Sequence, residues 1–145
     1  MAAKVTKAGG FAESLLKLLF QGQAYPLIAD IPAANLANLQ ISLHTANPGA
    51  SGDQNTNEVA YTGYARVAVP RSTGGFTVVA NQVNPNANIT FPQCTGGSVV
   101  ASWFGIGDST TGPGHLWYWG QISPAINISA GVIPQLTIAT TISET

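Results

Sequence analysis

The spacing of apolar residues changes near residue 35. Before this point, four apolar residues fall at i, i+4, i+7 and i+8, and they are Phe11, Leu15, Leu18 and Leu19. This spacing places them on one face of a helix, which Leu16 and Phe20 widen. Gly22 is a typical stop signal, so the pattern predicts a short amphipathic helix near 11–21.

Two interpretations of this helix are open. It could cap the core of its own domain, or it could belong to an N-terminal arm over residues 1–35 that docks on a neighbouring subunit through Phe11, Leu15, Leu18 and Leu19. Attachment to a membrane surface is disfavoured because the polar face carries little positive charge. The sequence also contains no apolar run long enough to cross a membrane as a helix.

From residue 36 onward, apolar and polar residues alternate with a period of two. Short segments rich in Val, Ile, Thr and aromatic residues are separated by clusters of Gly, Pro, Asn and Ser. They are LQISLHT, YARVAV, GFTVVAN, ANITF, SVVASWFGI, HLWYWGQI, AINIS and QLTIATTI. No helical pattern interrupts them, which argues against parallel βαβ units. We expect an all-β fold over 36–145, a jelly-roll-like antiparallel β-sandwich of about eight strands.

The composition favours contact with other proteins. Charged residues make up 8% of the 145 residues and the net charge is −1, whereas about 25% of a typical soluble domain is charged. So little charge indicates neither a nucleic acid nor an acidic membrane as partner. The single cysteine, Cys94, excludes an internal disulfide and is expected to be a buried, inert thiol.

Candidate catalytic groups are few. No GxSxG nucleophile motif is present, and the two histidines, His44 and His115, lack the spacing of a metal site. Asp53 and Asp108 could form a glycosidase pair, and Asp53 with Glu58 could bind a hard cation, but neither pair fits a recognised motif. We therefore expect a non-catalytic protein with no cofactor and no metal.

A long polar loop follows the first predicted strand. It runs from Ala46 to about Glu58, longer than the usual hairpin connection, and such loops are often functional. Its amide and hydroxyl side chains could lie against another protein, and the two arginines of the chain flank the next strand. The predicted interface residues here are Asp53, Gln54, Asn55, Asn57, Glu58, Arg66 and Arg71.

An aromatic cluster offers an alternative site. Trp117 and Trp119 would share one face of a strand, and Trp103 lies on the preceding strand, so the two strands are expected to form a hairpin. Flat aromatic rings can stack on sugar rings, but packing in the core is favoured, because a two-layer sheet protein must bury one face of each sheet; an intersubunit contact is the third alternative.

Several long motifs resemble a family of small virion proteins of tailed bacteriophages. The motifs are LHTANPG, TNEVAYTGYARV, FPQCTGG and GHLWYWGQISPAINISAG, and the resemblance extends from residue 42 to residue 141. Proteins of this kind are often labelled tail fibre proteins, and related ones are head decoration (cement) proteins. The resemblance implies a jelly-roll sandwich in a small symmetric oligomer and transfers no catalytic residue.

The resemblance and the composition together lead to a first functional hypothesis. We expect a capsid decoration protein on the outer capsid surface, made in the bacterial host cytoplasm, that binds the major capsid protein and stabilises the shell. It would form a homo-dimer or homo-trimer. The alternative is a tail fibre protein that binds a receptor or glycan through Trp103, Trp117 and Trp119.

Overall fold

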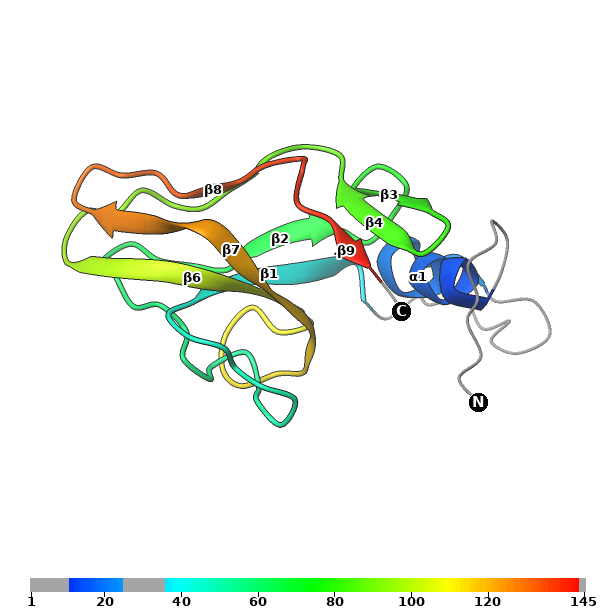
Figure 1. Ribbon diagram of the computed structural model, residues 1–145, viewed down its shortest axis with the longest axis horizontal. Coiled ribbons are helices and arrows are strands. Elements are labelled where there is room, and N and C mark those ends of the chain that lie inside the picture. The colour runs from blue at the N-terminus through cyan, green and yellow to red at the C-terminus, as the bar shows by residue number, and fades with distance from the viewer. Residues whose placement is uncertain (1–10, 25–35, 144–145) are drawn as a thin grey trace. The chain divides into compact units, whose positions relative to one another are not determined.

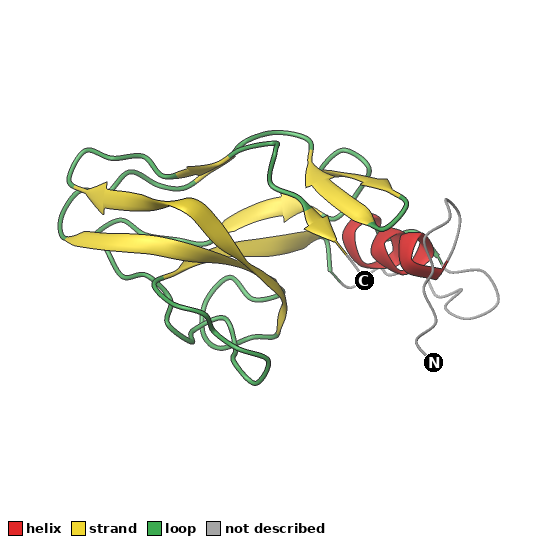
Figure 2. Ribbon diagram, in the orientation of Figure 1, coloured by secondary structure: helices red, strands yellow, loops and turns green. Residues whose placement is uncertain are grey.

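The computed structural model describes residues 11–24 and 36–143 of the chain (Figure 1). They contain one helix and nine strands, which form antiparallel sheets (Figure 2). The predicted all-β class with one short helix is therefore confirmed, whereas the jelly-roll arrangement stays a prediction. The boundary predicted between residues 35 and 36 adjoins 25–35, outside the described residues, and stays a prediction too.

The elements follow one another in this order: α1 (Phe11–Gln21), β1 (Asn38–His44), β2 (Val67–Pro70), β3 (Phe76–Val79), β4 (Gln82–Pro85), β5 (Ile89–Thr90), β6 (Ser98–Gly107), β7 (Leu116–Ser129), β8 (Gln135–Leu136) and β9 (Ile142–Ser143). They fall into two compact units. The first, here the helical unit, comprises Met1–Asn38, Pro70–Asn88 and Thr137–Thr145. The second, the large-sheet unit, comprises Leu39–Val69 and Ile89–Leu136.

The helical unit packs α1 against a three-stranded antiparallel sheet of order β3-β4-β9. The helix forms over the predicted residues, and its Leu16 and Phe20 side chains are fully buried. The Phe20 ring meets the Phe76 ring of β3 edge-on, with centroids 5.1 Å apart. Alternate residues of β3 are buried and exposed, as expected for a strand with one face on a core. The helix therefore contributes to the core of this unit.

The large-sheet unit is built on a four-stranded sheet of order β2-β1-β6-β7. Strands β1 and β6 are antiparallel with Ile41 opposite Ile106, and β6 and β7 are antiparallel with Ile106 opposite Tyr118. Ile41, Leu43 and Ile106 of this sheet are buried. A separate pair, β5 with β8, completes the unit.

Strand β7 corrects one expectation. The segments HLWYWGQI and AINIS were expected as two strands separated by a Ser-Pro turn, but Leu116–Ser129 is a single strand containing a cis Ser123–Pro124 bond. Opposite it, the register changes from Ala101↔Ile126 to Trp103↔Gln121, so the extra β7 residues form a bulge. A proline is tolerated there because β7 is an edge strand.

Strand β4 was not expected, because Asn and Pro in QVNPNAN are typical of turns. Val83 and Pro85 of β4 point to the buried side while Gln82 and Asn84 are more exposed. The segment QLTIATTI, expected as one strand, is divided into the short strands β8 and β9. Among the described residues, no helix has the length and apolar character needed to span a membrane.

Candidate functional site

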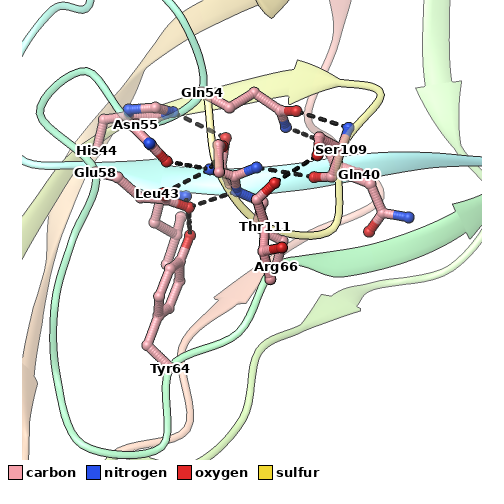
Figure 3. A network of polar contacts seen from close by, with 12 residues as sticks. Gln40, Leu43, His44, Gln54, Asn55, Glu58, Tyr64, Arg66, Ser109 and Thr111 are labelled. Carbon is pink, nitrogen blue, oxygen red and sulfur yellow. Dashed lines mark hydrogen bonds and ion pairs between the residues drawn. The ribbon is translucent and has the colours of Figure 1, made fainter. Parts of the chain in front are cut away.

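Two loops of the large-sheet unit meet beside strand β1, and Figure 3 shows the residues that join them. The first, the 45–58 loop, follows β1, and the second, the 108–115 loop, joins β6 to β7. The Gln54 backbone N–H donates to the Pro113 carbonyl at 2.8 Å, and the Ser109 N–H donates to Gln54 Oε1 at 2.9 Å. The loops are therefore joined directly to each other.

Arg66 is the central cation of this arrangement. Its guanidinium makes two 2.7 Å bonds to the Glu58 carboxylate, one from Nε and one from Nη2. It also donates to the Ser109 and Gly112 carbonyls, both at 2.8 Å, and to the Asn55 side chain at 2.9 Å. The bond to Glu58 raises the pKa of Arg66, so the cation is permanent at any physiological pH. One side chain thus connects both loops.

Tyr64 extends the network to the sheet. Its hydroxyl donates to Glu58 Oε1 at 2.8 Å and accepts the Leu43 N–H of β1 at 3.1 Å. Burial is the main reason that the pKa of Tyr64 is raised, so the phenol stays protonated. The Tyr64 ring also stacks on Phe91, with centroids 6.4 Å apart. The Arg66–Glu58 ion pair is therefore fixed to strand β1 through the half-buried phenol of Tyr64.

His44, at the end of β1, holds the other side of the 45–58 loop. It is fully buried, and its Nδ1 lies 2.8 Å from the Thr56 carbonyl while its Nε2 lies 2.8 Å from Ser42 Oγ. Because a carbonyl can only accept, Nδ1 carries the proton and Nε2 accepts from the Ser42 hydroxyl. Burial lowers the pKa of His44, so the imidazole is neutral at pH 7.

Gln54 is inserted between the two loops and the sheet. Its side chain is fully buried, and its Nε2 donates to the Gln40 carbonyl at 3.2 Å. The space for it depends on glycine: a Cβ on Gly107 would lie 2.3 Å from Gln54 Cδ, and one on Gly114 would lie 2.8 Å from Gln54 Oε1. Both polar ends of the amide are satisfied internally.

Asp53 organises the tip of the 45–58 loop. Its Oδ1 accepts the Asn55 N–H at 2.9 Å and the Thr56 N–H at 3.0 Å, which closes a tight turn. In the 108–115 loop, Asp108 plays a similar part, since its carboxylate accepts the N–H and the ring Nδ1 of His115 at 2.8 and 2.6 Å. Partial burial raises the pKa of Asp108, but these bonds outweigh it and hold the pKa below its ordinary value.

The chemistry open to this cluster is limited by how its groups are used. Every named polar side chain is bonded within the chain, and no buried side-chain N or O atom of the described residues lacks a partner. No group of three or more His, Cys, Asp and Glu side chains in the described part of the chain could hold a metal ion. The arrangement therefore acts as a brace that fixes the shape of two loops.

A family model described as Gp80, podophage GP4 fiber I protein gp80, matches residues 10–142. The chain belongs to this family. No curated protein matches it. Membership identifies a structural protein of a phage virion, which confirms the resemblance seen in the sequence at that level. The family description names a fibre protein, so it fits the fibre alternative at least as well as the capsid decoration hypothesis.

The predicted interface residues of the 45–58 loop divide into two groups. Gln54 is fully buried, and the side chains of Arg66 and Glu58 are 3% and 15% exposed, so these three are occupied internally. In the isolated chain these side chains brace the loops, and their contact with a partner stays a prediction. Asn55 and Asn57 are exposed and Asp53 is half-buried, so contact with a partner stays a prediction for these residues.

The predicted arm residues lie beside the buried face of α1. Leu15, Leu18 and Leu19 are half-buried, whereas the Phe11 side chain lies outside the described residues. Arg71, another predicted interface residue, closes the end of the helix: its guanidinium donates to the carbonyls of Leu18, Leu19 and Leu36. Arg71 therefore caps the helix, while the three leucines keep part of their apolar surface exposed.

The predicted aromatic hairpin is present, with Trp103 on β6 and Trp117 and Trp119 on β7, all half-buried. Glycine faces the rings, however: Trp119 lies opposite Gly105, and Phe104 lies opposite Gly120. A Cβ on Gly120 would lie 2.7 Å from the Phe104 ring, so that ring covers the glycine. In the pairing of β6 with β7, Trp117 has no residue directly opposite it. Sugar binding by the three tryptophans stays a prediction.

Residues that sequence reasoning missed are those that brace the loops from elsewhere. Tyr64, Ser109 and Gln40 were not singled out, and His44 was considered only for catalysis and metal binding. Tyr64 had one usable signal, because it lies two residues before Arg66 in an alternating segment. Ser109 and Gln40 take part through backbone atoms, which any residue could supply, so their sequence carried no signal.

Proposed function

We propose that this protein is a fibre subunit of a podophage virion, with a structural role and no catalytic one. The observation that carries the proposal is the family match, which spans residues 10–142 and names a fiber I protein. Its partners would be other virion proteins and further copies of itself. Capsid decoration is the competing assignment, and it predicts a very different number of copies.

The site supports a role in presenting loops. A loop that contacts a partner loses conformational entropy on binding, and a loop already fixed in one shape loses less. Arg66 fixes the 45–58 and 108–115 loops through bonds to Glu58, Ser109 and Gly112. The exposed residues Asn55 and Asn57 stand on this braced loop. We therefore assign the outer surface of the two loops to contact with a virion or host partner.

The proposal is tested by counting copies of the protein in purified virions. Quantitative mass spectrometry with the major capsid protein as internal reference is the measurement, and immunogold labelling locates the protein on the particle. A fibre subunit is expected at a few copies to a few dozen, with label at the tail. Hundreds of copies in fixed ratio to the capsid protein, with label over the head, would replace the fibre assignment by capsid decoration.

A further inference from the structure

We propose that two copies of this protein associate through strand β7, pairing edge to edge so that their four-stranded sheets become continuous. The partner is a second copy of the same chain. The inference does not depend on the fibre assignment, because it rests on the structure of one sheet edge.

Strand β7 is a long edge strand with no protection by charge. It lies at the end of the sheet order β2-β1-β6-β7 and runs for 14 residues. Its sequence, LWYWGQISPAINIS, contains no Asp, Glu, Lys, Arg or His. Among the described strands, β7 pairs with β6 alone, along one of its two edges. Soluble proteins normally place charges on such an edge to prevent pairing with another chain.

The side chains of β7 are also suited to a protein contact. Of its 14 residues, Ile128 alone is buried. Trp117, Trp119, Ile122 and Ile126 are all half-buried, so each retains apolar surface that a second sheet could cover. Aromatic residues are enriched in the centres of protein interfaces, where charged residues are depleted.

The opposite edge of the sheet explains why the partner strand is another β7. Strand β2 has four residues and ends in Pro70, which has no N–H to donate. A head-to-tail contact of β7 with β2 would therefore form a short ladder, although this arrangement could propagate into a filament. Pairing β7 with β7 uses the long edge twice and closes on itself with twofold symmetry.

Within β7, the segment before the bulge is the one expected to pair. Pro124 lacks an N–H, and the extra residues opposite Ser102 distort the ladder. Leu116–Ile122 precedes this bulge and contains the two tryptophans of the strand. We assign the contact to Leu116–Ile122 in antiparallel orientation, the hydrogen-bonding geometry that is slightly more stable per residue.

The experiment compares two lysine substitutions on the same strand by sedimentation equilibrium of the full-length chain. Gln121→Lys adds a charge inside the pairing segment, and Asn127→Lys adds the same charge beyond the bulge; both side chains are exposed, so neither change disturbs the core. We expect the wild type and Asn127→Lys to be dimers with similar dissociation constants. Gln121→Lys should raise the dissociation constant about tenfold or more.

Hydrogen exchange of the wild type gives a second readout that needs no variant. Outward amides of a free edge strand exchange quickly and become protected when they pair. Residues 116–122 should therefore gain protection as the protein concentration rises. The proposal is overturned if the wild type is a monomer or a trimer, or if Gln121→Lys associates as tightly as the wild type. It is also overturned if the protection that depends on concentration is confined to another segment. If the protein is a monomer but is present at fibre copy number in the virion, the dimer proposal fails and the fibre assignment stands. If it is a dimer present in hundreds of copies per virion, the fibre assignment fails and the dimer proposal stands.

Discussion

Replacement of Arg66 by methionine tests the brace most directly. The substitution keeps most of the side-chain volume but removes the cation that holds Glu58 and the carbonyls of Ser109 and Gly112. Breaking a buried ion pair by removing one partner costs about 3–5 kcal/mol, because the other charge remains without compensation. Glu58 retains 15% exposure, so water can reach it in part and the lower end applies, about 3 kcal/mol.

This loss should be visible in denaturation. For a domain of this size, about 3 kcal/mol corresponds to a fall in Tm of about 10 °C. Urea unfolding followed by tryptophan fluorescence measures the free energy of unfolding, since all three tryptophans lie on β6 and β7 beside the braced loops. Hydrogen exchange should show the largest loss of protection in the 45–58 and 108–115 loops.

A matched control uses another ion pair of the chain. His115 contacts Asp108 through its ring Nδ1 at 2.6 Å, and the two side chains are 80% and 24% exposed. His115→Ala should change the free energy of unfolding by no more than about 1 kcal/mol, as is usual for exposed pairs. If Arg66→Met costs less than about 1 kcal/mol, or no more than His115→Ala, the network is not a brace and the reasoning from burial is refuted.

Three further substitutions test separate parts of the structure. Burial lowers the pKa of His44 in the folded state, so the stability that the neutral imidazole allows is fully present above the unfolded pKa of about 6.5 and is lost as the pH falls below it. His44→Gln should therefore flatten this part of the curve of unfolding free energy against pH, measured by urea unfolding. Gly107→Ala would place a Cβ 2.1 Å from the His115 carbonyl oxygen, so it should lower the free energy of unfolding by about 1–3 kcal/mol. Gly112→Ala is the comparison, because its Cβ would meet no atom within 4 Å and only the positive φ of Gly112 opposes the substitution. Arg71→Met removes the donor to the last carbonyls of α1 and should reduce helical circular dichroism and cost about 1–2 kcal/mol; an unchanged helix signal would contradict the capping role.

The sequence predicted the elements whose pattern is local. The helix over 11–21 follows from apolar spacing, because it buries one face, and β1 and β6 follow from alternation. The polar residues of β1 are nevertheless buried as fully as the apolar ones, since loops cover that face of the strand. Strand β4 escaped prediction because Asn84 and Pro85 are turn residues by propensity, yet tertiary pairing with β3 and β9 overrides that preference. Ser123 and Pro124 were expected to form a turn between two strands for the same reason, but a bulge on the edge strand β7 accommodates the proline.

The site was harder to predict than the fold. A buried glutamine at position 54 could not be inferred from a loop composed of polar residues, because its partners are the Gln40 carbonyl and the Ser109 N–H. Both are backbone atoms, and their identity depends on how two loops meet rather than on residue type. The prediction that the 45–58 loop contacts a partner therefore placed buried and exposed side chains in one group, which the structure separates.

The use of charge within the chain leads to a last prediction, about salt. All seven Lys, Arg, Asp and Glu residues in the described part of the chain make a bond within it: Glu13, Lys17, Asp53, Glu58, Arg66, Arg71 and Asp108. The described surface that remains for partners is mainly amide, hydroxyl and apolar, so attachment should depend little on ionic strength, which weakens contacts between exposed charges. Retention of the protein on purified virions, measured by quantitative immunoblot across a salt series, should stay constant to within about twofold between low salt and about 1 M. Steady release over that range would mean that charged groups carry the contact, and the braced loops and the leucines of α1 would no longer be the candidates for it.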